Sequence, residues 1–356
     1  MTTQHLTPDL VKWLTTHANS LDQSTEYADQ LLPQLVAGGV FKHGIPTQLG
    51  GNGNPLQSAI DAITEVARYS LTAAFCAWGH RTLIENLRLS QSPLHQRLVP
   101  ELLAGERAGG TGLSNAVKFL SGIEELNVRI TEKAGKYYLN GTLPWITNLS
   151  SEKFAIIFAA DFQDEPNRPA LILAIPSEAG LERLPELPLV ALKGSHTHPV
   201  RLDNLELNKE WIISDNAQAY LAEIRPAFLG LQFGMAFGLA QKSLNEVENS
   251  FQYHSSRNVL KAEWEQAKQE LTRIEQALAQ GLANQQFITE PKSLFQLRID
   301  IVNVVASSIL LELQAGGGRG YLENTGSDFI RRWREMAFLP IVTPSAVQLR
   351  TILNQP

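Results

Sequence analysis

The chain has 356 residues, of which 44% are hydrophobic and 19% are charged, a composition typical of a globular protein with two or three domains. A net charge of −6 excludes a polybasic surface for nucleic acid or anionic lipid. The single cysteine, Cys76, excludes an internal disulfide and a thiolate zinc cluster, and it fits a reducing cytoplasm. The first residues lack the features of a signal peptide, and we expect no membrane span because no run reaches about 18 apolar residues.

Residues 8–105 have a helical pattern. Leu31, Leu32 and Leu35 fall on one face at helical spacing, and glycines break the pattern after them. Residues 56–89 then predict one or two mostly buried helices. We assign residues 1–108 to an N-terminal helical domain.

The hydrophobic period changes to two from residue 109 to about residue 213, which we assign to a middle domain. Short turns with Gly, Pro, Asn or Asp separate the predicted strands. Strands at this spacing without intervening helices predict an antiparallel barrel or sandwich. The strands are expected near residues 126–131, 136–143, 154–160, 170–175 and 200–207.

The C-terminal region, residues 214–356, is again helical. The first helix is long, and Gly230, Gly234 and Gly238 recur every fourth residue along it, so that another helix can come close. Long helices joined by short loops predict a bundle. The helices are expected at residues 217–251, 263–282 and 291–314.

Residues 137–148 form the most informative segment, with the sequence YYLNGTLPWITN. It reads as an alternating strand, an Asn-Gly turn at Asn140 and Gly141, and then a run around Trp145 and Thr147. Trp145 offers a flat amphipathic face and Thr147 a hydroxyl, which together suit a planar, hydrogen-bonding heterocycle. An ordinary hairpin with a buried Trp is the alternative interpretation.

This segment resembles the flavin-facing strand of the acyl-CoA dehydrogenase family. Residues 95–106, 112–115, 180–205 and 314–321 resemble four further family patterns in the same order along the chain. The resemblance implies a mainly α fold with a central β-barrel, in which an N-terminal helical domain, a middle antiparallel β-barrel and a C-terminal four-helix bundle follow one another. It also implies a flavoprotein oxidoreductase with FAD as its cofactor.

By this resemblance, Trp145 packs against the isoalloxazine ring and Thr147 donates toward its N5 atom. Leu113 and Ser114 line the pyrimidine edge of the ring, and Ser114 stands where the family has Thr. A solvent-facing hydroxyl on a strand is the alternative for Ser114.

The glycine-rich run that begins with Gln314 resembles a family loop that serves a flavin held mainly by a neighbouring subunit, which implies that Gln314 is a cofactor-binding residue and that the protein is a homodimer or homotetramer. Gly317, Gly318 and Gly320 let backbone N–H groups approach a pyrophosphate. A plain helix-breaking turn is the alternative.

Arg257 and Arg319 are candidate phosphate partners. No dinucleotide fingerprint of the Gly-x-Gly-x-x-Gly type follows a strand. The histidines lack metal-ligand spacing with a carboxylate, so no metal is expected, and His196 and His198 are interpreted as an exposed polar strand edge.

Both positions at which the family carries its catalytic glutamate hold other residues. Thr343 stands in place of the first glutamate, after a matching pair that ends in Glu335. Ile224 stands in place of the second, and the adjacent Glu223 would point about 100° away around the helix. Thr343 and Pro344 also fit the N-cap and first position of a final helix, which would bring a helix N-terminus to the site.

Three hypotheses follow. The favoured one is an FAD-dependent oxidoreductase that removes hydride from a CH–CH substrate, such as an acyl-CoA thioester, with a displaced base at Glu223 or Glu335. The second is a two-component monooxygenase of the same fold, which acts on another hydrophobic organic molecule with reduced flavin from a partner reductase. For that chemistry His80 is a candidate, although a satisfied helix-surface histidine is the simpler interpretation. The third is a non-catalytic flavin-binding interaction protein.

Overall fold

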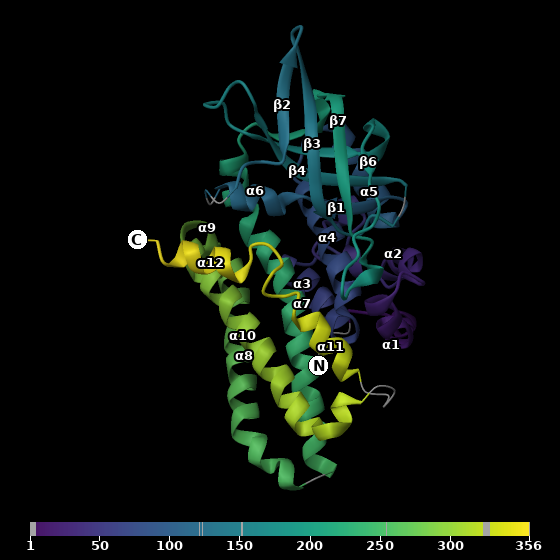
Figure 1. The fold of residues 1–356 in the computed structure, drawn as a ribbon, viewed down its shortest axis with the longest axis vertical. Helices are drawn as coiled ribbons and strands as arrows, with labels where there is room; N and C mark the ends of the chain where they lie inside the picture. The colour runs from purple at the N-terminus through teal and green to yellow at the C-terminus, as the bar shows by residue number, and fades with distance from the viewer. Residues whose placement is uncertain are drawn as a thin grey trace.

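The computed structural model describes residues 5–120, 122, 124–150, 152–253, 255–322 and 328–355. Figure 1 shows three regions, with a β-sheet at the top, long helices at the bottom, and the N-terminal helices packed between and beside them. The three regions follow the predicted order along the chain, while the domain boundaries themselves stay predictions.

The N-terminal region is helical because its apolar residues recur at helical spacing and polar caps separate the segments. Thr7 caps the first helix by accepting a hydrogen bond from the Leu10 N–H, and Ser70 caps α4 by accepting from the Ala73 N–H. Every residue of α4 is buried, including Cys76, so α4 is the central helix of the molecule. The elements are α1 (Pro8–Gln23), α2 (Ala28–Ala37), η1 (Val40–Lys42), η2 (Thr47–Leu49), α3 (Leu56–Tyr69), α4 (Leu71–Leu87) and α5 (Pro93–Ala104).

The described strands of the middle region form one eight-stranded sheet with the order β6-β7-β3-β2-β4-β5-β8, and β1 pairs with β4. Most pairings are antiparallel, as predicted, but β4 runs parallel to both β1 and β2, so the sheet is mixed. The elements are β1 (Ala108–Thr111), α6 (Leu113–Leu120), β2 (Val128–Lys133), β3 (Lys136–Ile146), β4 (Phe154–Phe162), β5 (Leu171–Pro176), η3 (Ser177–Ala179), β6 (Glu182–Arg183), η4 (Lys193–Ser195), β7 (His198–Glu206), η5 (Lys209–Trp211) and β8 (Ile212–Ser214).

The structure corrects two local predictions in this region. Asn140 and Gly141 do not form a turn but lie inside β3, where the pairing with β7 shifts register. Gly141 is needed because a Cβ there would come within 2.0 Å of the Asn127 carbonyl oxygen. Leu113 and Ser114, expected on a strand, instead begin the short helix α6.

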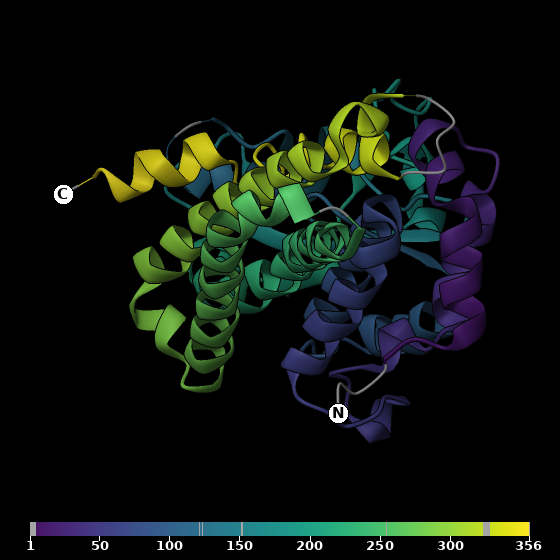
Figure 2. The ribbon, with the colours of Figure 1, turned by 90° about the horizontal axis from the view of Figure 1, so that it is seen from below.

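The C-terminal region contains the long helices α7, α8 and α10, which lie side by side in Figures 1 and 2. The helices α11 and α12 both pack against α10. The elements are α7 (Ala217–Tyr253), η6 (Ser255–Leu260), α8 (Lys261–Ala283), α9 (Gln286–Thr289), α10 (Pro291–Gly316), η7 (Gly317–Tyr321), α11 (Phe329–Met336) and α12 (Ala346–Leu353).

The small residues of α7 face α3. A Cβ on Gly234 would lie 2.8 Å from the Ile60 carbonyl oxygen, and one on Gly238 would lie 2.2 Å from the Thr64 carbonyl oxygen. The two helices therefore meet through their backbones, which explains the predicted glycine stripe.

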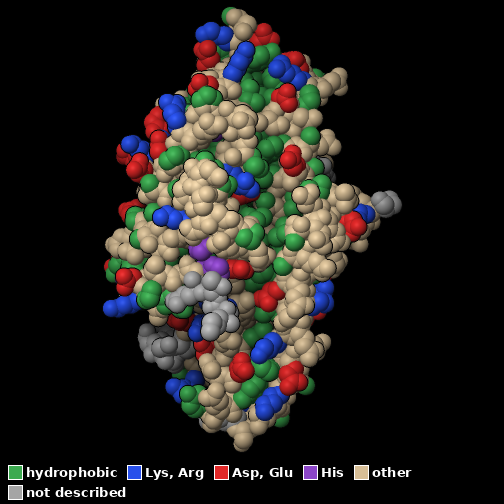
Figure 3. All heavy atoms as spheres, turned by 180° about the vertical axis from the view of Figure 1, so that it is seen from behind, with side chains coloured by type: hydrophobic (Ala, Val, Ile, Leu, Met, Phe, Trp, Pro, Cys, Tyr) green, Lys and Arg blue, Asp and Glu red, His purple; other side chains and the backbone are tan. Residues whose placement is uncertain are grey.

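One segment, Pro291–Tyr321, is long and apolar enough to cross a membrane by length and composition, contrary to the expectation that no run qualifies. However, 61% of its most apolar window is buried inside the protein, where α10 packs against α7, α8 and α12. This burial is typical of the core helix of a bundle. Acidic and basic side chains are interspersed over the face seen in Figure 3, which agrees with the absence of a polybasic sequence run.

Candidate functional site

A cavity of about 660 Å³ lies where the sheet region, α4, α7 and the chain after α11 meet. We call it the aromatic cavity. Its walls are mostly apolar, and its polar lining groups are hydroxyls and two cationic side chains. The lining residues are Phe75, Trp78, Thr111, Ser114, Lys118, Trp145, Leu189, Val190, Ala191, Leu192, Thr197, Phe228, Arg334, Ala337, Phe338, Ile341, Val342, Thr343 and Ser345.

Aromatic side chains from three elements form one wall of this cavity. Phe75 and Trp78 are three residues apart on α4, so they share a helix face, and their rings stack at 5.9 Å between centroids. Trp78 meets Phe228 of α7 edge-on at 5.3 Å, and its indole N–H donates to the Phe228 carbonyl oxygen over 3.3 Å. Phe338 contacts Phe75 at 4.6 Å. These contacts fix a rigid, water-excluding surface.

Three of the residues predicted from the sequence come together in the aromatic cavity. Trp145 lies near the end of β3 and keeps 56% of its surface exposed, Ser114 lies at the start of α6, and Thr343 lies in the segment before α12. The exposed indole contradicts the alternative of a buried structural Trp, because a core residue would not leave half its ring uncovered.

Thr147 and Leu113 lie behind this surface. Thr147 is buried, and its hydroxyl donates to the Ser195 carbonyl oxygen over 3.1 Å. Leu113 is fully buried in the core next to the cavity. Neither side chain lines the cavity, so in this structure neither of them reaches a ligand held there.

Thr343 is not the N-cap of the last helix, which corrects the prediction. Ser345 is the cap: its hydroxyl accepts from the Gln348 N–H, and the Gln348 side chain accepts from the Ser345 N–H, which makes a capping box. The Ser-x-x-Gln spacing was a visible signal for this cap. The Thr343 carbonyl oxygen accepts from the Gln232 side chain over 3.0 Å.

Neither glutamate proposed as a displaced base lines the aromatic cavity. Glu335 is fully buried; it accepts from the Leu71 N–H at the start of α4 over 2.9 Å and from Arg331 over 2.8 Å. Burial raises the pKa of Glu335, while Arg331 opposes the shift. Glu223 is exposed on α7. Neither carboxylate is therefore placed to remove a proton from a substrate in this cavity.

His80 is buried in α4 rather than exposed on the helix surface, and it is satisfied on both sides. Its Nε2–H donates to the Leu102 carbonyl oxygen over 3.0 Å, and its Nδ1 accepts from the Gly109 N–H over 3.0 Å. Burial lowers the pKa of His80 to about 4, so the ring is neutral at pH 7. His80 does not line the cavity and ties α4 to α5 and β1.

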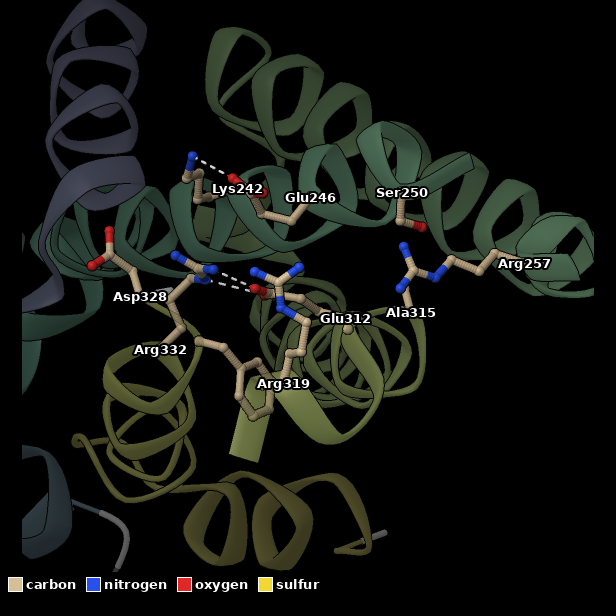
Figure 4. A pocket seen from close by; sticks show the side chains of 12 residues that line it. Lys242, Glu246, Ser250, Arg257, Glu312, Ala315, Arg319, Asp328 and Arg332 are labelled. Atoms are coloured by element: carbon tan, nitrogen blue, oxygen red, sulfur yellow. Dashed lines mark hydrogen bonds and ion pairs between the residues drawn. The ribbon is translucent and has the colours of Figure 1, made fainter. Parts of the chain in front are cut away.

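A second cavity, of about 470 Å³, lies between α7, η6, α10, η7 and α11. We call it the charged cavity, and Figure 4 shows its side chains. Lys242 pairs with Glu246 at 2.6 Å, and Arg332 pairs with Glu312. Its lining residues are Lys242, Glu246, Ser250, Arg257, Glu312, Ala315, Gly316, Arg319, Gly320, Asp328, Phe329 and Arg332.

The charged cavity contains cationic groups that no described residue neutralises. Among the described residues, Arg257 and Arg319 make no ion pair, and the Nη1 atom of Arg332 is buried without a hydrogen-bond partner. A Cβ on Gly317 or Gly318 would meet nothing within 4 Å, so the turn presents bare backbone to open space. An anionic group fits such an arrangement.

The predicted phosphate-binding residues are only partly gathered here. Arg257, Arg319 and Gly320 line the charged cavity, whereas Gly317 and Gly318 lie in the adjoining turn. Gln314 faces a different hollow, between α8 and α10. The charged cavity and the aromatic cavity share no lining residue.

Comparison with known proteins gives a consistent result, although no family model matches the chain. An acyl-CoA dehydrogenase of Bacillus subtilis (strain 168) is 24% identical over 248 residues, which is 67% of this chain and 64% of that relative. The chain thus matches less than two thirds of that relative's length.

Two solved structures share the whole architecture. A glutaryl-coenzyme A dehydrogenase in complex with glutaryl-CoA superposes with a TM-score of 0.79 at 18% identity, over 98% of this chain and 95% of that one. A dibenzothiophene monooxygenase of Paenibacillus sp. A11-2 superposes with a TM-score of 0.73 at 16% identity, over 97% of this chain and 94% of that one. The chain therefore has the fold of the acyl-CoA dehydrogenase family, as its sequence predicted.

Proposed function

We propose that the protein is an FAD-dependent oxidoreductase that holds the isoalloxazine ring in the aromatic cavity. The observation that carries this proposal is the exposed indole of Trp145 at the mouth of a cavity walled by aromatic rings. A flat face beside an apolar, water-excluding wall suits a flat heterocycle. The Ser114 hydroxyl lines the same cavity and supplies a donor for a ring oxygen or nitrogen.

The charged cavity supports the dinucleotide part of this proposal. Arg257, Arg319 and the unpartnered Nη1 of Arg332 supply donors for phosphate oxygens. Because the two cavities share no lining residue, we propose that the charged cavity of one subunit serves the flavin of its neighbour. A homodimer or homotetramer follows from that arrangement.

When bound, a flavin supplies a hydride acceptor or, in its reduced form, a reductant for dioxygen. The chain's contribution is to exclude water with the wall of Phe75, Trp78 and Phe228, and to orient the ring with Trp145 and Ser114. Lys118 and Arg334 also line the cavity, but each is paired with a carboxylate, Lys118 with Glu124 and Arg334 with Asp22.

The substrate of the favoured reaction is an acyl-CoA thioester or a related hydrophobic molecule, from which hydride leaves a CH–CH unit. This reaction also needs a base that removes the α-proton. None of the described residues that line the aromatic cavity carries a carboxylate, and Glu335 is held by Arg331 and the Leu71 N–H. A catalytic carboxylate would have to come from a rearranged segment or from another subunit.

The lack of a carboxylate among the described lining residues also favours a second candidate function. A two-component monooxygenase, which takes reduced flavin from a partner reductase, needs no α-proton base, and a monooxygenase is among the structural neighbours. The candidate partners therefore differ: an electron-transfer protein for the dehydrogenase and a flavin reductase for the monooxygenase.

A single-turnover experiment separates these functions. The purified protein is reconstituted with FAD, and its visible spectrum is recorded before and after anaerobic addition of acyl-CoA thioesters. Bleaching by a thioester supports the dehydrogenase. Bleaching only by a reductase, followed by oxygen in the product, supports the monooxygenase. Stable flavin binding without either reaction supports the non-catalytic interaction protein. Failure to bind flavin after reconstitution would contradict all three.

A further inference from the structure

A cluster of two histidines and two carboxylates lies at the start of β7, outside both cavities. His196 and His198 are two residues apart, and Glu186 lies on the chain that runs alongside them. The ligand atoms of these three side chains all lie within 4.8 Å of one another. Asp29 of α2 joins the cluster from the N-terminal region, 3.0 Å from His196 Nε2.

Backbone pairing beyond the end of β6 brings these groups together. The Leu184 N–H donates to the Pro199 carbonyl oxygen over 2.9 Å, and the Leu187 N–H donates to the Thr197 carbonyl oxygen over 3.0 Å. This register sets Glu186 opposite the two histidines. The carbonyl oxygen of His196 accepts from the Leu149 N–H over 3.1 Å, so its backbone is held from the other side as well.

Each of the two histidines uses one ring nitrogen for a hydrogen bond. The second ring nitrogen points away from the partner in that bond. His198 donates from Nδ1 to the Leu184 carbonyl oxygen over 2.9 Å, and its Nε2 has no partner in the described part of the chain although the residue is only 8% exposed. His196 uses Nε2 for Asp29, which leaves Nδ1 3.5 Å from Glu186 Oε1. That carboxylate oxygen is also buried without a hydrogen bond. Unpartnered buried atoms of this kind need an explanation.

We propose that Glu186, His196 and His198 bind a divalent cation of the zinc type. Two histidines and a glutamate form a donor set that zinc uses, with a fourth position left for water. The outer contacts match as well, because histidine ligands of metals commonly donate their other N–H to a carboxylate or a backbone carbonyl. Asp29 and the Leu184 carbonyl oxygen have these two roles here.

Charge and access are compatible with a cation. The side chain of His196 is 15% exposed and that of Glu186 is 27% exposed, so an ion reaches the cluster from solvent. Arg183 is a nearby cation that opposes binding, but its guanidinium donates to the Leu149 carbonyl oxygen, and two carboxylates offset its charge.

The cation would have a structural role. Glu186 precedes the loop of residues 187–195, and the two histidines follow it. Leu189, Val190, Ala191 and Leu192 in this loop line the aromatic cavity. A cation at the base of the loop therefore fixes one wall of that cavity, and through Asp29 it also attaches the loop to α2.

The test is zinc binding by the full chain after removal of any affinity tag and of bound metal by a chelator. We expect about one equivalent of Zn²⁺ to bind, to raise the melting temperature, and to be replaceable by Co²⁺ with a visible absorption band of a low-coordinate site. Glu186→Gln keeps the size of the side chain and should weaken binding more than Asp29→Asn, for which we expect about 10- to 100-fold. Glu182→Gln, an exposed carboxylate on β6, is the matched control and should bind as the wild type does.

Each variant is first compared with the wild type in its metal-free form by circular dichroism, and His196→Ala provides a second ligand deletion if Glu186→Gln does not fold. Absence of stoichiometric binding, or equal affinity of Glu186→Gln and Glu182→Gln, would overturn the site. Hydrogen exchange tests the structural role, because Zn²⁺ should protect the amides of residues 187–192. Binding without that protection would overturn the proposed fixing of the cavity wall.

Discussion

The aromatic cavity and the charged cavity are built in opposite ways. The aromatic cavity lies at the junction of all three regions of the chain, and its walls are side chains that bury one another. The charged cavity is formed within the C-terminal region alone, and two of its cations, Arg257 and Arg319, make no ion pair with a described residue. Binding in the first should depend on apolar contact, whereas binding in the second should depend on charge and therefore on salt.

Replacing Glu335 should have the largest effect and tests whether this carboxylate, which does not line the aromatic cavity, has a structural or a catalytic role. Glu335→Ala removes the buried partner of Arg331, leaves only the more exposed Asp328 to pair with it, and deprives the Leu71 N–H of its acceptor, so we expect a loss of about 3–5 kcal/mol in the free energy of unfolding. Denaturant unfolding measures this loss. Glu223→Ala is the control and should change stability by less than about 0.5 kcal/mol, because Glu223 is exposed. Loss of flavin reduction in a Glu335→Ala protein of normal stability would instead identify Glu335 as the base.

Arg319→Ala should distinguish the roles of the two cavities, because only the charged cavity is proposed to bind the phosphates of FAD. Removing a charged donor from a phosphate costs about 1.5–3 kcal/mol, so FAD affinity should fall roughly tenfold or more. Riboflavin has no phosphate, and its affinity should not change. Fluorescence titration at two salt concentrations measures both, and Lys12→Ala on α1 is an exposed cationic control. An equal loss for FAD and riboflavin would contradict the proposed role of the charged cavity.

The pH dependence of stability tests whether α4, the helix that forms a wall of the aromatic cavity, depends on a neutral His80. Its pKa is lowered from 6.5 to about 4, so between these values the unfolded chain binds more protons than the folded chain. Stability should therefore fall as the pH drops from 6.5 toward 4, by up to about 1.4 kcal/mol per pH unit from this one group. We expect a shallower pH dependence for His80→Gln, measured by unfolding at each pH. An unchanged slope would show that another group carries the titration.

Trp145→Ala should cause the smallest change in free energy, but it should affect flavin binding more than stability. Loss of the ring contact should weaken binding of both FAD and riboflavin by about 0.5–1.5 kcal/mol. The melting temperature of the flavin-free protein should hardly change, because the indole is exposed. Trp145→Phe keeps a flat face and should retain most of the affinity. A larger loss of stability than of flavin affinity would mean that Trp145 belongs to the core.

The sequence predicted the architecture because it depends on repeated local signals, which are helical spacing in the outer regions and alternation in the middle one. It also predicted that Trp145, Ser114 and Thr343 would share a site, although this relied on resemblance rather than on spacing. The three residues line one cavity only because the fold packs the sheet, α6 and the segment before α12 together.

Other features could not be predicted because distant backbone decides them. Asn140 and Gly141 have the signature of a turn, but the close approach of Asn127 keeps the strand continuous and places the glycine in an irregular pairing. Thr147 looked free to donate until the fold brought the Ser195 carbonyl oxygen to it. The histidine pair looked like a polar edge because Glu186 and Asp29 reach it only through tertiary contacts.

The backbone contact between α3 and α7 limits how a ligand can reach the aromatic cavity. Two helices that touch at Gly234 and Gly238 cannot slide or separate without breaking dense contacts along their length. The helical scaffold should therefore move as one piece. Opening is therefore expected in the surface segment of residues 337–345, which covers the cavity and is not held by the proposed cation, and in the proposed enzyme this segment would control substrate uptake and product release.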